Sequence, residues 1–201
     1  MILKLDRIKG ERIGLWVLLC MLLIAISTIT RIVLAVKSFS QLDFTLLNDL
    51  EIILLGLFYD LANAIYFSLP LVLYLWLIPE RIYKKPWHRF VLYTLFFIFS
   101  FLLIFNGIAE FFFWDEFNVR FNFIAVDYLV YTTEVVGNIH QSYPLEWIIS
   151  AVILLCTLMV YFFRSRIKAA SSGTMHFKTR SKYIGYYAVV FMVILFTVTS
   201  K

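Results

Sequence analysis

Residues 111–144 read FFFWDEFNVRFNFIAVDYLVYTTEVVGNIHQSYP and form the longest interval between the apolar runs of this chain. Read as a helix from Arg120 to Asn138, the interval places its polar side chains on a single narrow stripe. The stripe consists of Arg120, Asp127, Tyr131, Glu134 and Asn138. A narrow polar stripe on a large apolar body is typical of a helix that lies at a membrane surface or packs against membrane-spanning helices. The interval therefore predicts an amphipathic helix over about 120–138 in a membrane protein.

The composition of the whole chain supports the same class. Of its 201 residues, 62% are hydrophobic and 15% are charged, whereas soluble domains have roughly 45–50% apolar and about 25% charged residues. The formal net charge of +5 follows the expected membrane topology and does not form a nucleic-acid-binding surface. We therefore expect an integral membrane protein that does not bind nucleic acid.

Five apolar runs follow one another along the chain, at about 13–36, 52–78, 90–109, 145–163 and 183–199. Each is near the ~20 residues that cross ~30 Å of hydrocarbon, and the last is at the short limit. The first run is longer than the apolar core of a signal peptide and lacks its cleavage pattern. The predicted fold is all-α, a polytopic membrane helical bundle in one domain (1–201). It has five transmembrane helices and an extracytoplasmic amphipathic helix between the third and the fourth.

The distribution of Lys and Arg predicts the orientation of this bundle. Fourteen of the 18 basic residues lie in the N-terminal segment, in the turn 79–89 and in the loop 164–182. Basic loops stay on the cytoplasmic side of a membrane. The N-terminus is therefore expected in the cytoplasm, and the C-terminus and the interval 111–144 on the extracytoplasmic side.

Asp60 and Asn63 are the most informative residues within an apolar run. Asp60 is expected roughly 12 Å deep, at 1.5 Å per residue, where a carboxylate costs about 2.5–3.5 kcal/mol and must face protein or water. Asn63 is one turn on and is expected to share its face, and Pro70 is expected to kink the helix below them. One interpretation is an interhelical polar contact in which Asp60 pairs with Arg31. The other is a lipid-headgroup or ion site.

Two further features of the interval 111–144 allow a structural and a functional interpretation. Trp114 beside Asp115 and Glu116 is typical of an interfacial aromatic belt, and two carboxylates alone are too few oxygen ligands for a divalent cation. The polar stripe is either a solvated face or a docking surface for a headgroup or a soluble domain. Arg120 is the one strong phosphate-binding group on the predicted extracytoplasmic loops.

The sequence contains no self-sufficient catalytic or metal-binding motif. His88, His140 and His176 are scattered and form no HExxH pattern, and Cys20 and Cys156 lie in apolar runs without a second cysteine at metal-ligand spacing. No nucleophile motif or phosphate-binding loop is present. We predict no catalytic residue, no metal site and no cofactor in this chain.

Several segments nevertheless resemble the membrane portion of the lipoteichoic acid synthase-like family. The segments are 114–117 (WDEF), 121–134 (FNFIAVDYLVYTTE), 138–139 (NI) and 142–144 (SYP), together with 58–61 (FYDL). The resemblance covers nearly the whole chain and is most specific in the aromatic interval. These proteins are membrane phosphoglycerol transferases of the alkaline phosphatase/sulfatase superfamily, and this chain is most similar to their Gram-negative members.

The resemblance implies an enzyme in which five N-terminal spans precede a large extracytoplasmic catalytic domain. In the family, that domain holds a Thr nucleophile and a divalent metal, commonly manganese, and transfers phosphoglycerol from phosphatidylglycerol to an acceptor. The sequence stops at Lys201, where the linker to such a domain is expected. The nucleophile and the metal ligands therefore have no counterpart among these residues, and the chain is expected to be either a fragment or a free-standing membrane domain.

The expected function is that of a membrane anchor that presents phosphatidylglycerol to its own C-terminal catalytic domain in a bacterial cytoplasmic membrane. The alternatives are a standalone membrane protein that binds lipid or a partner subunit, and a transporter or channel component. An odd number of spans without an internal repeat disfavours the last. The candidate headgroup or docking residues are Arg31, Asp60, Asn63, Arg120, Asp127, Tyr131 and Glu134.

Overall fold

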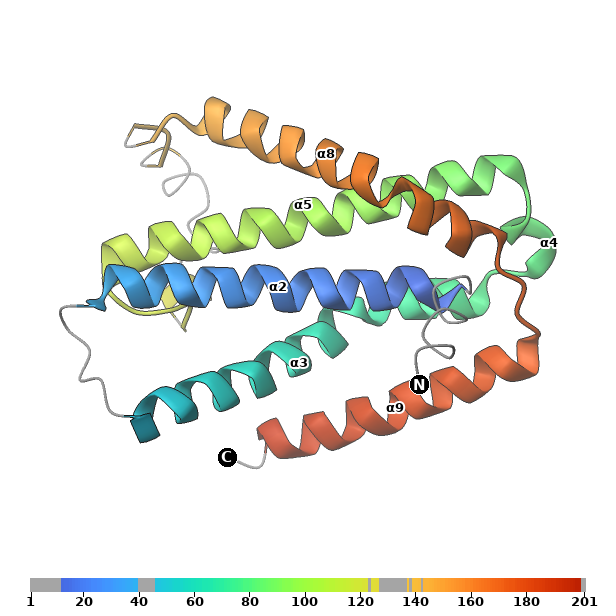
Figure 1. Cartoon of the computed structure of the whole chain (residues 1–201), viewed down its shortest axis with the longest axis horizontal. Helices are drawn as coiled ribbons and strands as arrows, with labels where there is room; N and C mark the ends of the chain where they lie inside the picture. Colours follow the sequence, from blue (N-terminus) through green and yellow to red (C-terminus); the bar gives the residue numbers. More distant parts are fainter. Residues whose placement is uncertain are drawn as a thin grey trace.

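Long helices that alternate in direction make up the fold (Figure 1). The computed structural model describes residues 12–39, 46–122, 124–126, 137, 139–141 and 143–199. In these residues the long helices are α2 (Ile13–Lys37), α3 (Leu46–Leu77), α5 (Pro86–Phe117), α8 (Leu145–Ser172) and α9 (Phe177–Thr199). A short helix, α4 (Glu80–Tyr83), connects α3 to α5, and no β-strand occurs in the described part of the chain. The predicted all-helical class is confirmed.

Helix α2 lies at the centre of the bundle. It contacts α3, α5 and α8, while α8 also packs on α5 and α9 packs on α3. Leu15, Leu19, Leu22 and Leu23 of α2 are buried, and their spacing places them on one face of a helix. They meet Leu71 of α3 and residues of α5 and α8 in one apolar core, which includes Leu92, Phe96 and Ile167.

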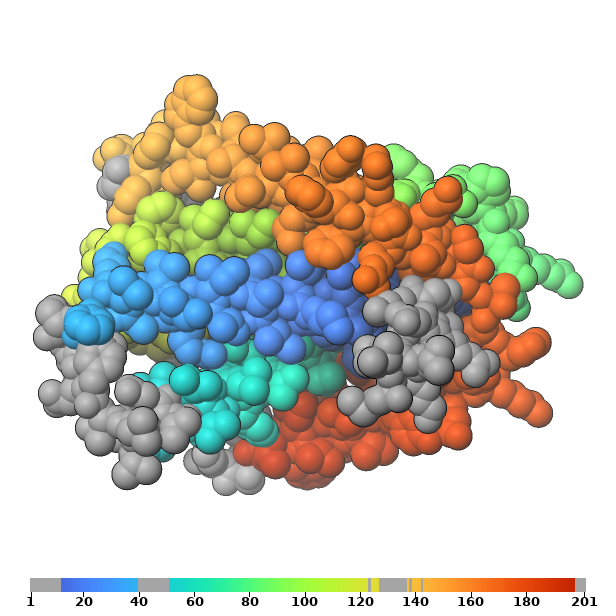
Figure 2. Space-filling model, in the orientation of Figure 1, coloured from blue at the N-terminus to red at the C-terminus, as the bar shows by residue number. Residues whose placement is uncertain are grey.

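The outward faces of these helices are also apolar. Large hydrophobic side chains are exposed on all five long helices, for example Ile32, Leu54, Phe90, Phe162 and Phe196. Figure 2 shows one elongated side of the molecule, on which the side chains of α8, α2, α3 and α9 are visible. A surface of this kind is rare on soluble monomers and is typical of contact with lipid.

Among the described helices, four are long and apolar enough to cross a membrane: α2, residues 51–77 of α3, α5 and α8. Together with the apolar outward faces, they indicate a membrane protein. Helix α9 is outside this group; it is shorter, and its first turns carry Lys178, Arg180 and Lys182.

Four helices extend beyond the apolar runs that predict them. Helix α3 begins at Leu46 rather than 52. Helix α5 continues to Phe117, eight residues past the predicted end at 109, and α8 continues to Ser172 rather than 163. Helix α9 begins at Phe177 rather than 183, so the expected loop 164–182 shortens to 173–176. The hydropathy signal reports only the part of a helix inside hydrocarbon, whereas helical hydrogen bonding continues into the interface where Arg, Lys and Ala are good helix formers. Helix α3 continues through Pro70.

The predicted helix over 120–138 is wrong at its start. Helix α5 ends at Asn118, whose φ of 52° is left-handed and reverses the chain. The Asn122 side chain then accepts a hydrogen bond from the backbone N–H of Ile124 at 3.0 Å, which is how an N-cap begins a helix. Residues 124–126 are helical, so Arg120 precedes the helix. Asp127, Tyr131, Glu134 and Asn138 lie outside the described residues.

Candidate functional site

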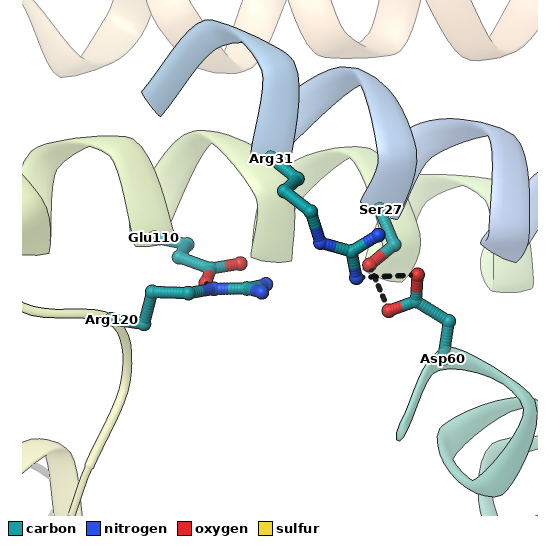
Figure 3. A network of polar contacts seen from close by, with 5 residues as sticks. All are labelled: Ser27, Arg31, Asp60, Glu110 and Arg120. Atoms are coloured by element: carbon teal, nitrogen blue, oxygen red, sulfur yellow. Dashed lines mark hydrogen bonds and ion pairs between the residues drawn. The ribbon is translucent and has the colours of Figure 1, made fainter. Parts of the chain in front are cut away.

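Ion pairs gather at the end of the bundle where α2 and α5 terminate. We call this group the distal polar cluster; it consists of Ser27, Arg31, Lys37, Asp60, Glu110, Asp115 and Arg120. Figure 3 shows these residues except Lys37 and Asp115. The cluster joins α2, α3, α5 and the turn that follows α5.

The first pair in the cluster is the one that the sequence predicts. Arg31 Nη2 donates to Asp60 Oδ2 at 2.7 Å, and Ser27 Oγ donates to Asp60 Oδ1 at 2.5 Å (Figure 3). The Asp60 side chain is only 3% exposed. Both of its oxygens therefore have a partner from α2, and a charge that would be costly in the membrane interior is compensated. The predicted pairing of Arg31 with Asp60 is confirmed.

The local sequence explains how this contact forms. Ser27 and Arg31 are four residues apart on α2, so they lie on the same face. On α3, Gly56 is one turn before Asp60, and a Cβ there would lie 2.3 Å from Cζ of Arg31. The guanidinium therefore lies directly against the backbone of α3 at Gly56. The sequence analysis missed Ser27 and Gly56, although their spacing from Arg31 and Asp60 is a readable signal.

Asn63 does not join Asp60. Asn63 is exposed and Asp60 is buried, so the prediction of one shared polar face is wrong. Three residues turn a helix by 300°, which leaves the two side chains about 60° apart at 3.6 residues per turn. This angular difference is enough to leave Asn63 exposed, because Asp60 points directly at α2.

The second pair involves Arg120, the predicted phosphate-binding residue. Its Nε donates to Oε1 of Glu110 at 2.5 Å, and the Glu110 side chain is 9% exposed while that of Arg120 is 42% exposed. Figure 3 shows Arg120 reaching back from the turn along Glu110, with the end of its guanidinium directed away from the carboxylate. In the described residues, Glu110 is the hydrogen-bond partner of Arg120, through Nε alone. Sequence reasoning missed Glu110 because the pairing depends on the chain reversal at Asn118.

The third pair joins the ends of α2 and α5. Lys37 forms a salt bridge with Asp115, and its Nζ lies 4.4 Å from the centre of the Phe111 ring. With this pair, the distal polar cluster contains three cations and three carboxylates. Asp115 is thus already engaged by a cation, which removes one of the two neighbouring carboxylates considered for a divalent metal.

The carboxylates of the cluster are all engaged by cations. In the part of the chain that the structure describes, no three His, Cys, Asp or Glu residues are grouped so as to hold a metal ion. What remains for a ligand is the partly exposed guanidinium of Arg120.

Comparison with known proteins gives no relative for this chain: no family model, curated protein or solved structure matches it.

Proposed function

We propose that this chain is the membrane domain of a phosphoglycerol transferase-like enzyme. It anchors a catalytic domain that follows Lys201 on the extracytoplasmic side, and it presents phosphatidylglycerol to that domain. The proposal rests on the resemblance of the segments around 114–144 and on the distal polar cluster. The divalent metal, a manganese ion by the same resemblance, belongs to the catalytic domain.

The proposal includes a fifth span and an orientation. Helix α9 has 23 residues and packs along α3, and Figure 1 shows it running toward the end of the bundle where α2 terminates. Its second half exposes Val189, Val193 and Phe196, which suits lipid contact. With α9 as a span, the chain crosses a bacterial cytoplasmic membrane five times, with its N-terminus inside and its C-terminus outside.

The observation that carries the proposal is the state of Arg120. Its Nε is held by a buried carboxylate, which fixes the direction of the guanidinium, while its two Nη atoms lie at the end directed away from that carboxylate (Figure 3), and its side chain is 42% exposed. Such a fork binds the oxygens of a phosphate diester. We propose that Arg120 binds the headgroup of phosphatidylglycerol in the outer leaflet. Asp127, Tyr131 and Glu134 remain predicted docking residues of the following helix.

Two substitutions that affect the same ion pair test this assignment. Arg120→Ala removes the phosphate-binding group and is expected to weaken phosphatidylglycerol binding about tenfold, since a hydrogen bond to a charged group contributes about 1.5–3 kcal/mol. Glu110→Gln keeps Arg120 and frees it from a competing carboxylate, so binding is expected to stay equal or to increase. The measurement is native mass spectrometry of the purified chain with phosphatidylglycerol. Equal losses in the two variants would show that the pair serves only the fold.

The reading frame after Lys201 separates this function from a standalone lipid-binding protein. A continuation of several hundred residues with a sulfatase-like core supports the anchor, and a stop codon directly after Lys201 contradicts it. Turnover of phosphatidylglycerol by the purified 201-residue chain would contradict the proposal that catalysis belongs to the following domain.

A further inference from the structure

A second candidate site lies at the opposite end of the bundle, where α2 begins, α3 ends and α9 begins. A partly open cavity of about 270 Å³ is lined there by residues of α2, α3 and α9 together with Arg12 and Met175. Its walls are apolar and aromatic apart from two arginines, Arg12 and Arg180. It extends along α9 from Arg180 to Val190, which is about 15 Å at 1.5 Å per residue.

The two arginines are buried at the polar end of this cavity. Arg12 is 1% exposed and Arg180 is 8% exposed. Nη1 of Arg12 donates to the carbonyl of Ile78 at 3.0 Å, and Nη1 of Arg180 donates to the carbonyls of Trp76 and Ile78 at 2.8 and 2.7 Å. Trp76 belongs to the last turn of α3 and Ile78 directly follows the helix, so both cations cap its C-terminus.

Capping uses only part of each guanidinium. Nε and Nη2 of Arg12 and Nε of Arg180 are buried without a hydrogen-bond partner. The face of the Arg12 guanidinium lies 3.6 Å from the centre of the Tyr83 ring, which leaves only its edge for a ligand. Neither arginine forms a salt bridge with a carboxylate among the described residues. Two adjacent buried cations with spare N–H donors are costly unless an anion joins them.

Three neutral polar groups that line the cavity already have hydrogen-bond partners. The indole N–H of Trp16 donates to Ser68 at 2.9 Å, that of Trp76 donates to Ser181 at 3.2 Å, and the Tyr187 hydroxyl donates to the carbonyl of Ile65. Among the described side chains that line the cavity, the unpartnered buried donors therefore belong to the two cations. Burial lowers the pKa of Arg12 and the nearby Arg180 lowers it further, while the carboxylate of Glu80, which is itself paired with Lys84, raises it.

We infer that this cavity binds an anionic glycerophospholipid, with the phosphate on Arg12 and Arg180 and an acyl chain along the apolar wall toward Val190. A soluble anion needs the guanidinium pair but not an apolar passage, and a neutral lipid needs the passage but not two cations. Only an anionic lipid uses both. The site is at the end opposite Arg120, so it faces the other leaflet, and it does not depend on the proposed transferase function.

The first test compares charge variants at the two arginines with one at an exposed lysine of α9. The 201-residue chain in detergent is titrated with phosphatidylglycerol or phosphatidylcholine of the same acyl chains, and bound lipid is counted by native mass spectrometry. Arg180→Gln and Arg12→Gln are each expected to lower the preference for phosphatidylglycerol about tenfold. The control Lys178→Gln removes the same charge from an exposed position on α9 and leaves the preference unchanged. Equal effects at 178 and 180 would overturn the site.

A second pair of variants covers the case in which an arginine variant fails to fold. Ile184→Trp fills the cavity, whereas Val189→Trp adds the same ring on α9 at a residue that does not line it. Only the first is expected to reduce phosphatidylglycerol binding, and no difference between them would overturn the inference.

Two further measurements exclude other occupants. Inorganic phosphate that stabilises the chain as much as phosphatidylglycerol, in a manner that depends on Arg180, would assign the site to a free anion. If the preference for phosphatidylglycerol appeared only in an Asp6→Asn/Glu11→Gln variant, the N-terminal carboxylates would be the counter-charge of the two arginines. Either result would contradict the inference that the cavity binds an anionic lipid. If neither result is observed, the inference is supported. The loss of phosphatidylglycerol binding caused by Arg180→Gln is expected to be the same with and without Arg120→Ala, because the two residues lie at opposite ends of the bundle. The two proposals therefore fail separately.

Discussion

At the scale of single residues, the contact between Asp60 and Arg31 shows how a charged pair is kept inside an apolar bundle. The pair is readable from the sequence because a carboxylate and a guanidinium in neighbouring apolar runs each need a partner. Its close geometry is not readable, because it depends on Ser27 and on the absence of a side chain at Gly56. Composition identifies the partners, whereas packing determines how they meet.

Removal of the Asp60 carboxylate is expected to be strongly destabilising. Asp60→Ala leaves Arg31 buried without its counter-charge and is expected to lower the free energy of unfolding by about 3 kcal/mol. Asn63→Ala, at an exposed position on the same helix, is expected to change it by less than ~0.5 kcal/mol. Reversible unfolding in mixed micelles measures both. An Asp60→Ala variant as stable as Asn63→Ala would contradict a structural role for the pair.

Gly56 gives an independent test of the same contact. A Cβ at residue 56 forces Arg31 to move, so Gly56→Ala is expected to destabilise by about 1 kcal/mol or more, the size of one net hydrogen bond. At Gly185 of α9 a Cβ meets nothing within 4 Å, and Gly185→Ala is expected to stabilise by about 0.5–1 kcal/mol through helix propensity. The two substitutions therefore have opposite signs in the same unfolding assay. Stabilisation by both would mean that Arg31 does not rest on α3 at Gly56.

At the scale of the helices, the sequence predicts the apolar centre of each element better than its ends. The first run agrees with α2 to within one residue, while α5, α8 and α9 extend well into segments that hydropathy assigns to loops. The decisive signals at those ends are local: Asn118 in a left-handed conformation, and Asn122 as the cap of the next helix. The predicted helical stripe does not indicate that Arg120 pairs with Glu110, because the two residues meet only through the chain reversal at Asn118.

The end of α5 is therefore expected to depend on the residue at 118. Asn118→Gly keeps the left-handed conformation without a Cβ and is expected to be neutral or slightly stabilising. Asn118→Val places a β-branched side chain in that conformation and is expected to destabilise by about 1–2 kcal/mol. Thermal unfolding of the two variants measures the difference. Equal stability of Asn118→Gly and Asn118→Val would contradict the left-handed end of α5.

At the scale of the whole molecule, the charged side chains gather at the two ends of the bundle, and the outward faces of the long helices are apolar. The long helices expose hydrophobic side chains along their outward faces, while Arg12, Asp60, Glu110 and Arg180 are buried. One end collects the capping arginines of α3 and the basic turns, and the other collects the neutral distal polar cluster. This arrangement is expected of a bundle whose length crosses a bilayer and whose charges mark its two faces.

The central claim is that the chain crosses the membrane five times and leaves residue 201 on the side of Arg120. Fusion of alkaline phosphatase or green fluorescent protein after Lys201, in a bacterial host, tests it most directly. The account predicts an active phosphatase, which folds only outside the cytoplasm, and a dark fluorescent fusion after export through the general secretion pathway. A bright fluorescent fusion with an inactive phosphatase would place the C-terminus in the cytoplasm and contradict the account.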